Sequence, residues 1–126
     1  MTDRSVLIVE DDETLRRIVG RQLRARRFDV TEAASAEEAT SRLAAGLRPT
    51  VVLLDLNLPG DTGWDLLRSD MWRRAGSPPV LVASATTVDP RRLDEFRCAG
   101  YLPKPFPMET LVDTLERLLK GERSEP

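Results

Sequence analysis

The sequence predicts an α/β fold built on a doubly wound parallel sheet whose two faces are covered by helices. Five short apolar segments alternate along the chain with five longer segments whose apolar residues recur at helical spacing. The segments at 6–9 and 51–54 are apolar throughout, which is typical of strands buried on both faces. With 126 residues, of which 40% are apolar and 32% charged, the chain has the size and composition of one globular domain.

The predicted strands are short and rich in valine and leucine. The segment at 51–54 is the strongest of them, and like the first segment it runs directly into acidic residues. We expect five strands, at 6–9, 28–31, 51–54, 80–83 and 101–102.

Each predicted helix carries a stripe of apolar residues, and local signals mark several helix ends. Ser35 with Glu38 three residues later forms a capping-box pattern, and Gly46 is a stop signal. Asp89 before Pro90 predicts an N-cap followed by proline in the first helical position. We expect five helices, around 15–23, at 36–45, around 64–71, at 90–97 and at 107–120.

We expect one domain over residues 1–120, followed by a short polar tail over residues 121–126. No internal repeat, low-complexity tract or interior linker is visible in the sequence. The polar tail is either a frayed end or the beginning of a linker.

Composition argues against several classes of function. The formal net charge of −2 indicates no bulk attraction to nucleic acid or to anionic membranes. No apolar run approaches the roughly 20 residues that cross a bilayer, and no signal peptide is visible. The single cysteine, Cys98, excludes an internal disulfide and suits a reducing compartment, so we expect a cytoplasmic protein. The chain contains no histidine and cannot itself be a phosphohistidine donor.

Polar side chains follow four of the five predicted strands. Glu10 and Asp11 follow the first, Asp55 the third, Ser84 the fourth and Lys104 the fifth. Because the carboxyl ends of parallel strands meet at one edge of a sheet, we expect these side chains to converge. Crowded carboxylates repel one another by about 4 kcal/mol per pair at close range. A hard divalent cation such as Mg²⁺ is their natural counter-ion, and a site neutralised by Mg²⁺ and an amine could accept a phosphoryl group.

Four ordered segments of the sequence resemble a known family. They read VLIVEDD, VVLLDLNLPGDTGWDLL, LVASA and GYLPKPF, and they lie at close to the spacings of the receiver domain of bacterial response regulators. The resemblance covers nearly the whole chain, and it implies the sheet order 2-1-3-4-5 that is found in the chemotaxis member of the family.

By this resemblance Asp55 is the aspartate that becomes phosphorylated. Glu10 and Asp11 correspond to the acidic pair that binds Mg²⁺, with Asp11 as the more direct ligand. Asn57 lies where the family offers a backbone carbonyl to the metal. The resemblance also places Asn57 and Thr86 at positions that tune the hydrolysis rate of the phosphorylated aspartate.

The resemblance assigns four further roles. Ser84 corresponds to the hydroxyl residue that binds the phosphoryl group, and Lys104 to the amine that holds it. Pro105 corresponds to a proline that follows this lysine through a cis peptide bond. Tyr101 corresponds to the aromatic switch residue that turns inward when the hydroxyl residue moves. The implied output surface consists of the segments 90–97, 101–102 and 107–120.

The function implied is that of a phosphoacceptor in two-component signal transduction. A sensor histidine kinase or a histidine phosphotransfer protein is the expected donor, and Mg²⁺ is the expected cofactor. The output would go to a downstream protein or to an output domain, with no direct binding of nucleic acid by this domain and no membrane contact. The chain is not an enzyme in the usual sense, although it would take part in its own phosphorylation and dephosphorylation.

Two alternatives come from other classes of protein. A non-phosphorylated pseudo-receiver would act purely as an interaction module, but it would be expected to lose an acid or the lysine of the site. A phosphatase of the haloacid dehalogenase type needs a second acid two residues after the nucleophile, where Asn57 stands. Basic residues on the first helix form either a solvated face or a docking surface for an acidic partner; they are Arg16, Arg17, Arg21, Arg24, Arg26 and Arg27.

Two departures from the family pattern fall on the implied output surface. The distance from Ser84 to Lys104 along the chain is shorter than is usual, which predicts a shortened fourth helix or exit. Arg97 stands where a glycine commonly ends that helix in a left-handed backbone conformation.

Overall fold

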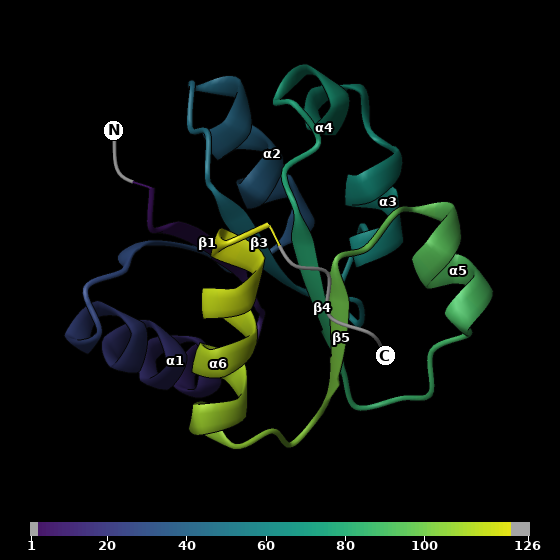
Figure 1. Cartoon of the computed structure of the whole chain (residues 1–126). Coiled ribbons are helices and arrows are strands. Elements are labelled where there is room, and N and C mark those ends of the chain that lie inside the picture. Colours follow the sequence, from purple (N-terminus) through teal and green to yellow (C-terminus); the bar gives the residue numbers. More distant parts are fainter. Residues whose placement is uncertain (1–2, 122–126) are drawn as a thin grey trace.

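The sheet is parallel throughout and has the predicted strand order. The structure is a computed structural model that describes residues 3–121. Its strands lie in the order β2-β1-β3-β4-β5 (Figure 1), so the α/β fold class and the order 2-1-3-4-5 are confirmed. The strands are β1 (Ser5–Val9), β2 (Asp29–Ala33), β3 (Val51–Asp55), β4 (Val80–Ser84) and β5 (Gly100–Pro103).

Six helices connect the strands in the described part of the chain, where the sequence predicted five. They are α1 (Glu13–Ala25), α2 (Ala36–Ala44), α3 (Gly63–Arg68), α4 (Asp70–Arg74), α5 (Pro90–Glu95) and α6 (Met108–Leu119). The predicted helix around 64–71 is divided at Ser69, whose backbone is extended. The Ser69 hydroxyl donates to the carbonyl of Leu66 and accepts from the amide of Trp72, so it ends α3 and caps α4.

Helices cover both faces of the sheet. Figure 1 shows α1 and α6 on one face and α2, α3, α4 and α5 on the other. Alternate residues of each central strand enter separate cores: Ile8 and Leu53 pack with α1 and α6, whereas Leu7 and Leu54 pack with the other four helices. All four of these side chains are buried, which explains why the segments 6–9 and 51–54 are apolar at every position.

Helix ends follow the local signals in the sequence with one exception. Ser35 accepts from the amide of Glu38 and Asp89 from that of Arg91, so both act as N-caps. Glu38 does not complete the predicted capping box; its carboxylate instead accepts from Arg42 one turn later. Asp12 caps α1 by accepting from the amide of Leu15.

The fourth predicted helix, α5, is short and ends in a left-handed residue. It stops at Glu95 rather than Arg97, and Arg97 has a φ of 54°. The amide of Cys98 then bonds the carbonyl of Leu93 at 2.8 Å, the closing bond of a helix C-terminus that usually uses glycine. Arg97 therefore adopts the left-handed backbone conformation that glycine commonly takes at such a helix end.

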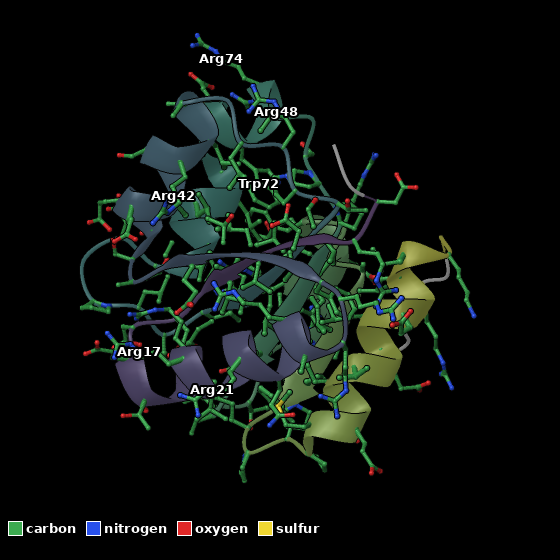
Figure 2. All side chains as sticks on the ribbon, turned by 90° about the vertical axis from the view of Figure 1, so that its left-hand side faces the viewer. Arg17, Arg21, Arg42, Arg48, Trp72 and Arg74 are labelled. Carbon is green, nitrogen blue, oxygen red and sulfur yellow. The ribbon has the colours of Figure 1, made fainter. Side chains whose placement is uncertain are left out.

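The basic run on α1 does not form one surface. Arg16 and Arg24 turn toward Glu32 on β2, each with a nitrogen 3.2 Å from its carboxylate. Arg17 and Arg21 point outward from α1 (Figure 2). The run therefore combines inward structural contacts with a small exposed basic face.

Within residues 3–121, no helix is both long enough and apolar enough to cross a membrane. The predicted domain boundary at 120 remains a prediction, and residues 122–126 of the predicted tail lie outside the described residues.

Arg4 joins the beginning of the chain to α6 and to the turn before β2. Its guanidinium lies 2.8 Å from Glu116 and donates to the carbonyl of Arg26 at 2.8 Å. The same group stacks 4.2 Å above the ring of Phe28. The hydrogen bond from Arg4 lowers the pKa of Glu116 from its ordinary value, and the positive charge of Arg4 and that of Lys120 act in the same direction.

This lowered pKa predicts a pH-dependent contribution to stability. A carboxyl group with a lower pKa in the folded state stabilises the fold above its unfolded pKa, and this contribution is lost as the pH falls through the folded value. We expect Glu116→Gln to reduce the free energy of unfolding at pH 7 by about 0.5 kcal/mol, since the pair is solvent-screened. Urea unfolding at pH 7 and at pH 3 measures the difference, which should vanish at the lower pH. An equal difference at both values would contradict the assignment.

Candidate functional site

The predicted polar residues converge at the carboxyl edge of the sheet. Glu10 follows β1, Asp55 ends β3, Ser84 ends β4 and Lys104 follows β5. The amide of Lys104 donates to the carbonyl of Ser84 at 2.9 Å, which ties the loop after β5 to the end of β4. The parallel ladder therefore delivers side chains distant in sequence to one small area.

Three carboxylates form the acidic part of this site. Glu10, Asp11 and Asp55 each offer an oxygen within 4.8 Å of the others. Glu10 is 6% exposed and Asp55 is 5% exposed, whereas Asp11 lies on the surface. Burial weakens the screening by water, so the mutual repulsion of these groups needs a positive partner.

Lys104 supplies one positive charge to the acidic cluster. Its Nζ atom lies 2.5 Å from Oε1 of Glu10 and 3.1 Å from Oδ2 of Asp55. The lysine side chain is itself only 17% exposed, so the ion pairs are shielded from solvent. One ammonium group thereby bridges the ends of β1 and β3.

The pKa values of Glu10 and Lys104 depend on two opposing effects, burial and the ion pairs of the site. Burial raises the pKa of Glu10 to about 7, although its hydrogen bonds from Lys104 and from the amide of Asp12 act in the opposite direction. For Lys104, burial is the largest single effect and lowers the pKa. The hydrogen bonds and charges of Glu10 and Asp55 together outweigh it, so the pKa of Lys104 is raised and the amine stays charged.

Each oxygen of the Asp55 carboxylate has a defined donor. Oδ2 accepts from Lys104, and Oδ1 accepts from the backbone amide of Asn57 at 3.0 Å. The Asn57 side chain extends to the hydroxyls of Ser84, at 3.1 Å, and Thr86, at 3.4 Å. The carboxylate is therefore held in a fixed orientation beside a small cluster of neutral polar groups.

Ser84 and Tyr101 are connected through Thr86. Ser84 is 1% exposed and its Oγ atom lies 3.0 Å from the Thr86 hydroxyl. The Tyr101 hydroxyl donates to the carbonyl of Thr86 at 3.4 Å, and the Tyr101 side chain is half-buried. The two predicted switch residues are thus linked through one intervening residue. The peptide bond between Lys104 and Pro105 is cis.

Two residues support the site without having been singled out for it in the sequence. Arg16 donates to the carbonyl of Glu10 at 2.9 Å and also reaches Glu32, so it holds the end of β1 beside β2. Gly63 packs against β3, where an added Cβ atom would lie 2.9 Å from the carbonyl oxygen of Asp55. Nothing in the sequence signals the inward direction of Arg16, because other arginines of the basic run lie on the same helix.

The doubly wound sheet and the acid-lysine site at its carboxyl edge define a phosphoacceptor class of signalling domain, rather than a nucleotide-binding domain with a glycine-rich loop. Comparison with known families agrees with this class. The family model described as "Response regulator receiver domain" matches residues 6–116. The chain belongs to the response regulator receiver domain family and is a regulatory domain of two-component systems.

Curated relatives extend beyond the length of this chain. The DNA-binding response regulator MtrA of Mycolicibacterium smegmatis is 34% identical over 125 residues, a match covering 96% of this chain and 53% of MtrA. The transcriptional activator protein PfeR of Pseudomonas aeruginosa is 37% identical over 123 residues, covering 94% of this chain and 38% of PfeR. The chain therefore spans about half or less of the relatives that it matches.

A similar structure has nearly the same length as this chain. The Vibrio cholerae chemotaxis protein CheY4 superposes with a TM-score of 0.81 at 29% identity. The match covers 90% of this chain and 96% of CheY4, so the two folds correspond over nearly the full length of both chains.

The close approach of Gly63 to Asp55 predicts a specific sensitivity. We expect Gly63→Ala to lower the free energy of unfolding by about 1–3 kcal/mol, because the added methyl group meets backbone that cannot move without shifting β3. Chemical denaturation measures this cost. Gly20→Ala in α1 is the matched control, since its methyl group meets the side-chain ends of Glu32 and Arg24 rather than backbone, and alanine favours the helix. Equal effects of the two changes would contradict the packing argument.

Proposed function

We propose that this chain accepts a phosphoryl group on Asp55 from the phosphohistidine of a sensor histidine kinase or a histidine phosphotransfer protein, in a Mg²⁺-dependent reaction. The observation that carries the proposal is the setting of Asp55. Its buried carboxylate is oriented by Lys104 and by the Asn57 amide, and it lies beside the carboxylates of Glu10 and Asp11.

The donor set fits a hard divalent cation. Three carboxylates and one ammonium leave an excess of negative charge, and oxygen is the ligand atom that Mg²⁺ prefers. We assign Glu10, Asp11, Asp55 and the backbone carbonyl of Asn57 as the residues that would hold the ion. When bound, Mg²⁺ would neutralise charge on the phosphoryl oxygens.

The chemical step uses the residues at the edge of the sheet. A carboxylate oxygen of Asp55 attacks phosphorus, the new P–O bond forms as the P–N bond breaks, and the imidazole of the donor leaves with the electron pair. Lys104 neutralises a phosphoryl oxygen, and Ser84 donates its hydroxyl to another. Later attack by water on phosphorus would regenerate the Asp55 carboxylate.

The output is proposed to begin at Ser84. Movement of its hydroxyl toward the phosphoryl group would break its contacts with Asn57 and Thr86, and Tyr101 is bonded to the same Thr86. Inward rotation of Tyr101 would then change the surface formed by α5, β5 and α6. The downstream target is either another protein or an output domain, as the greater length of MtrA and PfeR suggests. We place this activity in the cytoplasm.

Direct phosphorylation tests the proposal. Incubation of the chain with acetyl phosphate and Mg²⁺, followed by intact-mass measurement, should give one phosphoryl adduct. We expect no adduct in Asp55→Asn. In Lys104→Ala, or without Mg²⁺, the adduct should form at least about a hundredfold more slowly, because the charge on the phosphoryl oxygens is no longer stabilised. Absence of an adduct in the unaltered chain, at any donor concentration, would favour the pseudo-receiver and remove the phosphoacceptor assignment.

Mg²⁺ binding can be tested without phosphorylation. A ligand that binds only the folded chain stabilises it, by about 1 kcal/mol at a concentration several times the dissociation constant. We therefore expect millimolar Mg²⁺ to raise Tm by about 4 °C. Asp11→Asn should remove most of this shift, whereas the control Asp29→Asn, at the exposed beginning of β2, should retain it. An unchanged shift in Asp11→Asn would place the ion elsewhere.

A further inference from the structure

A second cation, Arg92, lines a pocket that also reaches Asn57, whose backbone amide donates to Asp55. This pocket of about 200 Å³ opens between the segments that follow β3 and β4, the beginning of α3 and the beginning of α5. Its lining includes Asn57, Thr86, Trp64 and Arg92. Asn57 and Thr86 belong to the polar cluster beside Asp55, so the pocket joins that cluster to Arg92.

Arg92 is held by aromatic rings. Its guanidinium lies 4.8 Å from the centre of the Trp64 ring and 5.7 Å from that of Phe96, and the two rings are stacked 5.1 Å apart. The Nε atom of Arg92 is buried and has no hydrogen-bond partner among the described residues. A buried donor of a charged group without an acceptor is unfavourable, so an anion reaching this guanidinium would be stabilised.

The other cations and anions around the pocket already have partners. Arg68 faces Asp65, and Arg91 faces Asp89. The Asp89 carboxylate also accepts from the amide of Arg91 and caps α5. Within residues 3–121, no ion pair joins Arg92 to a carboxylate. Arg92 is therefore the cation of this pocket that remains available for a new negative charge.

Phosphorylation of Asp55 would create such a charge. Before transfer, the three carboxylates of the site are matched by Lys104 and a divalent cation. A phosphoryl group carries about two negative charges and replaces the single charge of the carboxylate, so about one negative charge becomes unmatched. We propose that Arg92 is a phosphoryl-binding residue, which leaves the Trp64 ring and donates to the phosphoryl group on Asp55 across this pocket. This proposal rests on the proposed function of Asp55 as a phosphoacceptor.

If Arg92 binds the phosphoryl group, its contact with the Trp64 ring must be weak enough to break, which a packing role would not require. A charge-assisted hydrogen bond to a doubly charged oxyanion is stronger than the attraction of a cation to the uncharged face of an aromatic ring. The rings therefore keep Arg92 oriented near the pocket without holding it too strongly to be released. Since Trp64 loses its cation when Arg92 moves, the indole fluorescence would report the transfer.

Beryllofluoride, a fluoride complex that binds carboxylates as a phosphoryl mimic, tests the proposal at equilibrium. The full chain is titrated with it in the presence of Mg²⁺, and the midpoint is measured by isothermal titration calorimetry, whose signal does not require Arg92. Tryptophan fluorescence is followed in parallel. We expect Arg92→Met to weaken binding about tenfold, as for one lost charge-assisted hydrogen bond. Arg92→Lys should restore most of the affinity. The control Arg91→Met removes the same charge from an adjacent exposed residue and should change the midpoint less than twofold.

Three outcomes would overturn the assignment of Arg92. First, Arg92→Met and Arg92→Gln could both bind beryllofluoride with the same midpoint as the unaltered chain, while their Tm values show that they are folded. Arg92 would then have only a packing role. An Arg92-dependent fluorescence change in Asp55→Asn would show that the pocket binds the free anion rather than the Asp55-bound group. If the unaltered chain binds no beryllofluoride and forms no adduct with acetyl phosphate, the proposed function is wrong, and so is the role assigned to Arg92.

Discussion

The contact on which the site depends is the double ion pair of Lys104 with Glu10 and Asp55. It joins three separate strand ends, and it is possible only because the parallel sheet brings those ends to one edge. Without the ammonium group, two carboxylates would lie almost fully buried beside each other, at a cost that the surrounding core would have to offset. The same pairing orients Asp55, so the stability of the site and the reactivity that we propose for Asp55 have a common electrostatic origin. Burial excludes water from the carboxylates of Glu10 and Asp55, and their ion pairs with Lys104 offset the cost of that desolvation.

Most of the fold could be predicted because strands buried on both faces leave a clear trace in the sequence. The strand segments, the sheet order implied by resemblance, and the caps at Ser35 and Asp89 agree with the structure. The division of the third helix at Ser69 could not be foreseen from apolar spacing, since residues on both sides keep the same stripe. What ends α3 there is a single hydroxyl competing for backbone groups, an effect that periodicity does not record.

The candidate site also contains residues that could be predicted from the sequence and residues that could not. Residues that follow strands, such as Asp55 and Lys104, were found because topology fixes where strand ends meet. Arg16 and Arg92 could not be assigned, because an arginine on a helix looks the same in sequence whether it points to solvent, to a carbonyl or to a ring. Their directions depend on contacts between elements, namely α1 with β2 and α5 with α3. Placement of these side chains therefore required the packed structure.

Gly63 has a consequence for how substitutions are distributed along the chain. It has no functional group, yet it lies against the backbone that presents Asp55, and an added methyl group would come within 2.9 Å of the Asp55 carbonyl oxygen. A survey of every possible substitution would therefore register this turn as intolerant, alongside the residues that carry the chemistry. Chemical participation and mutational intolerance are separable properties, and position 63 would show the second without the first.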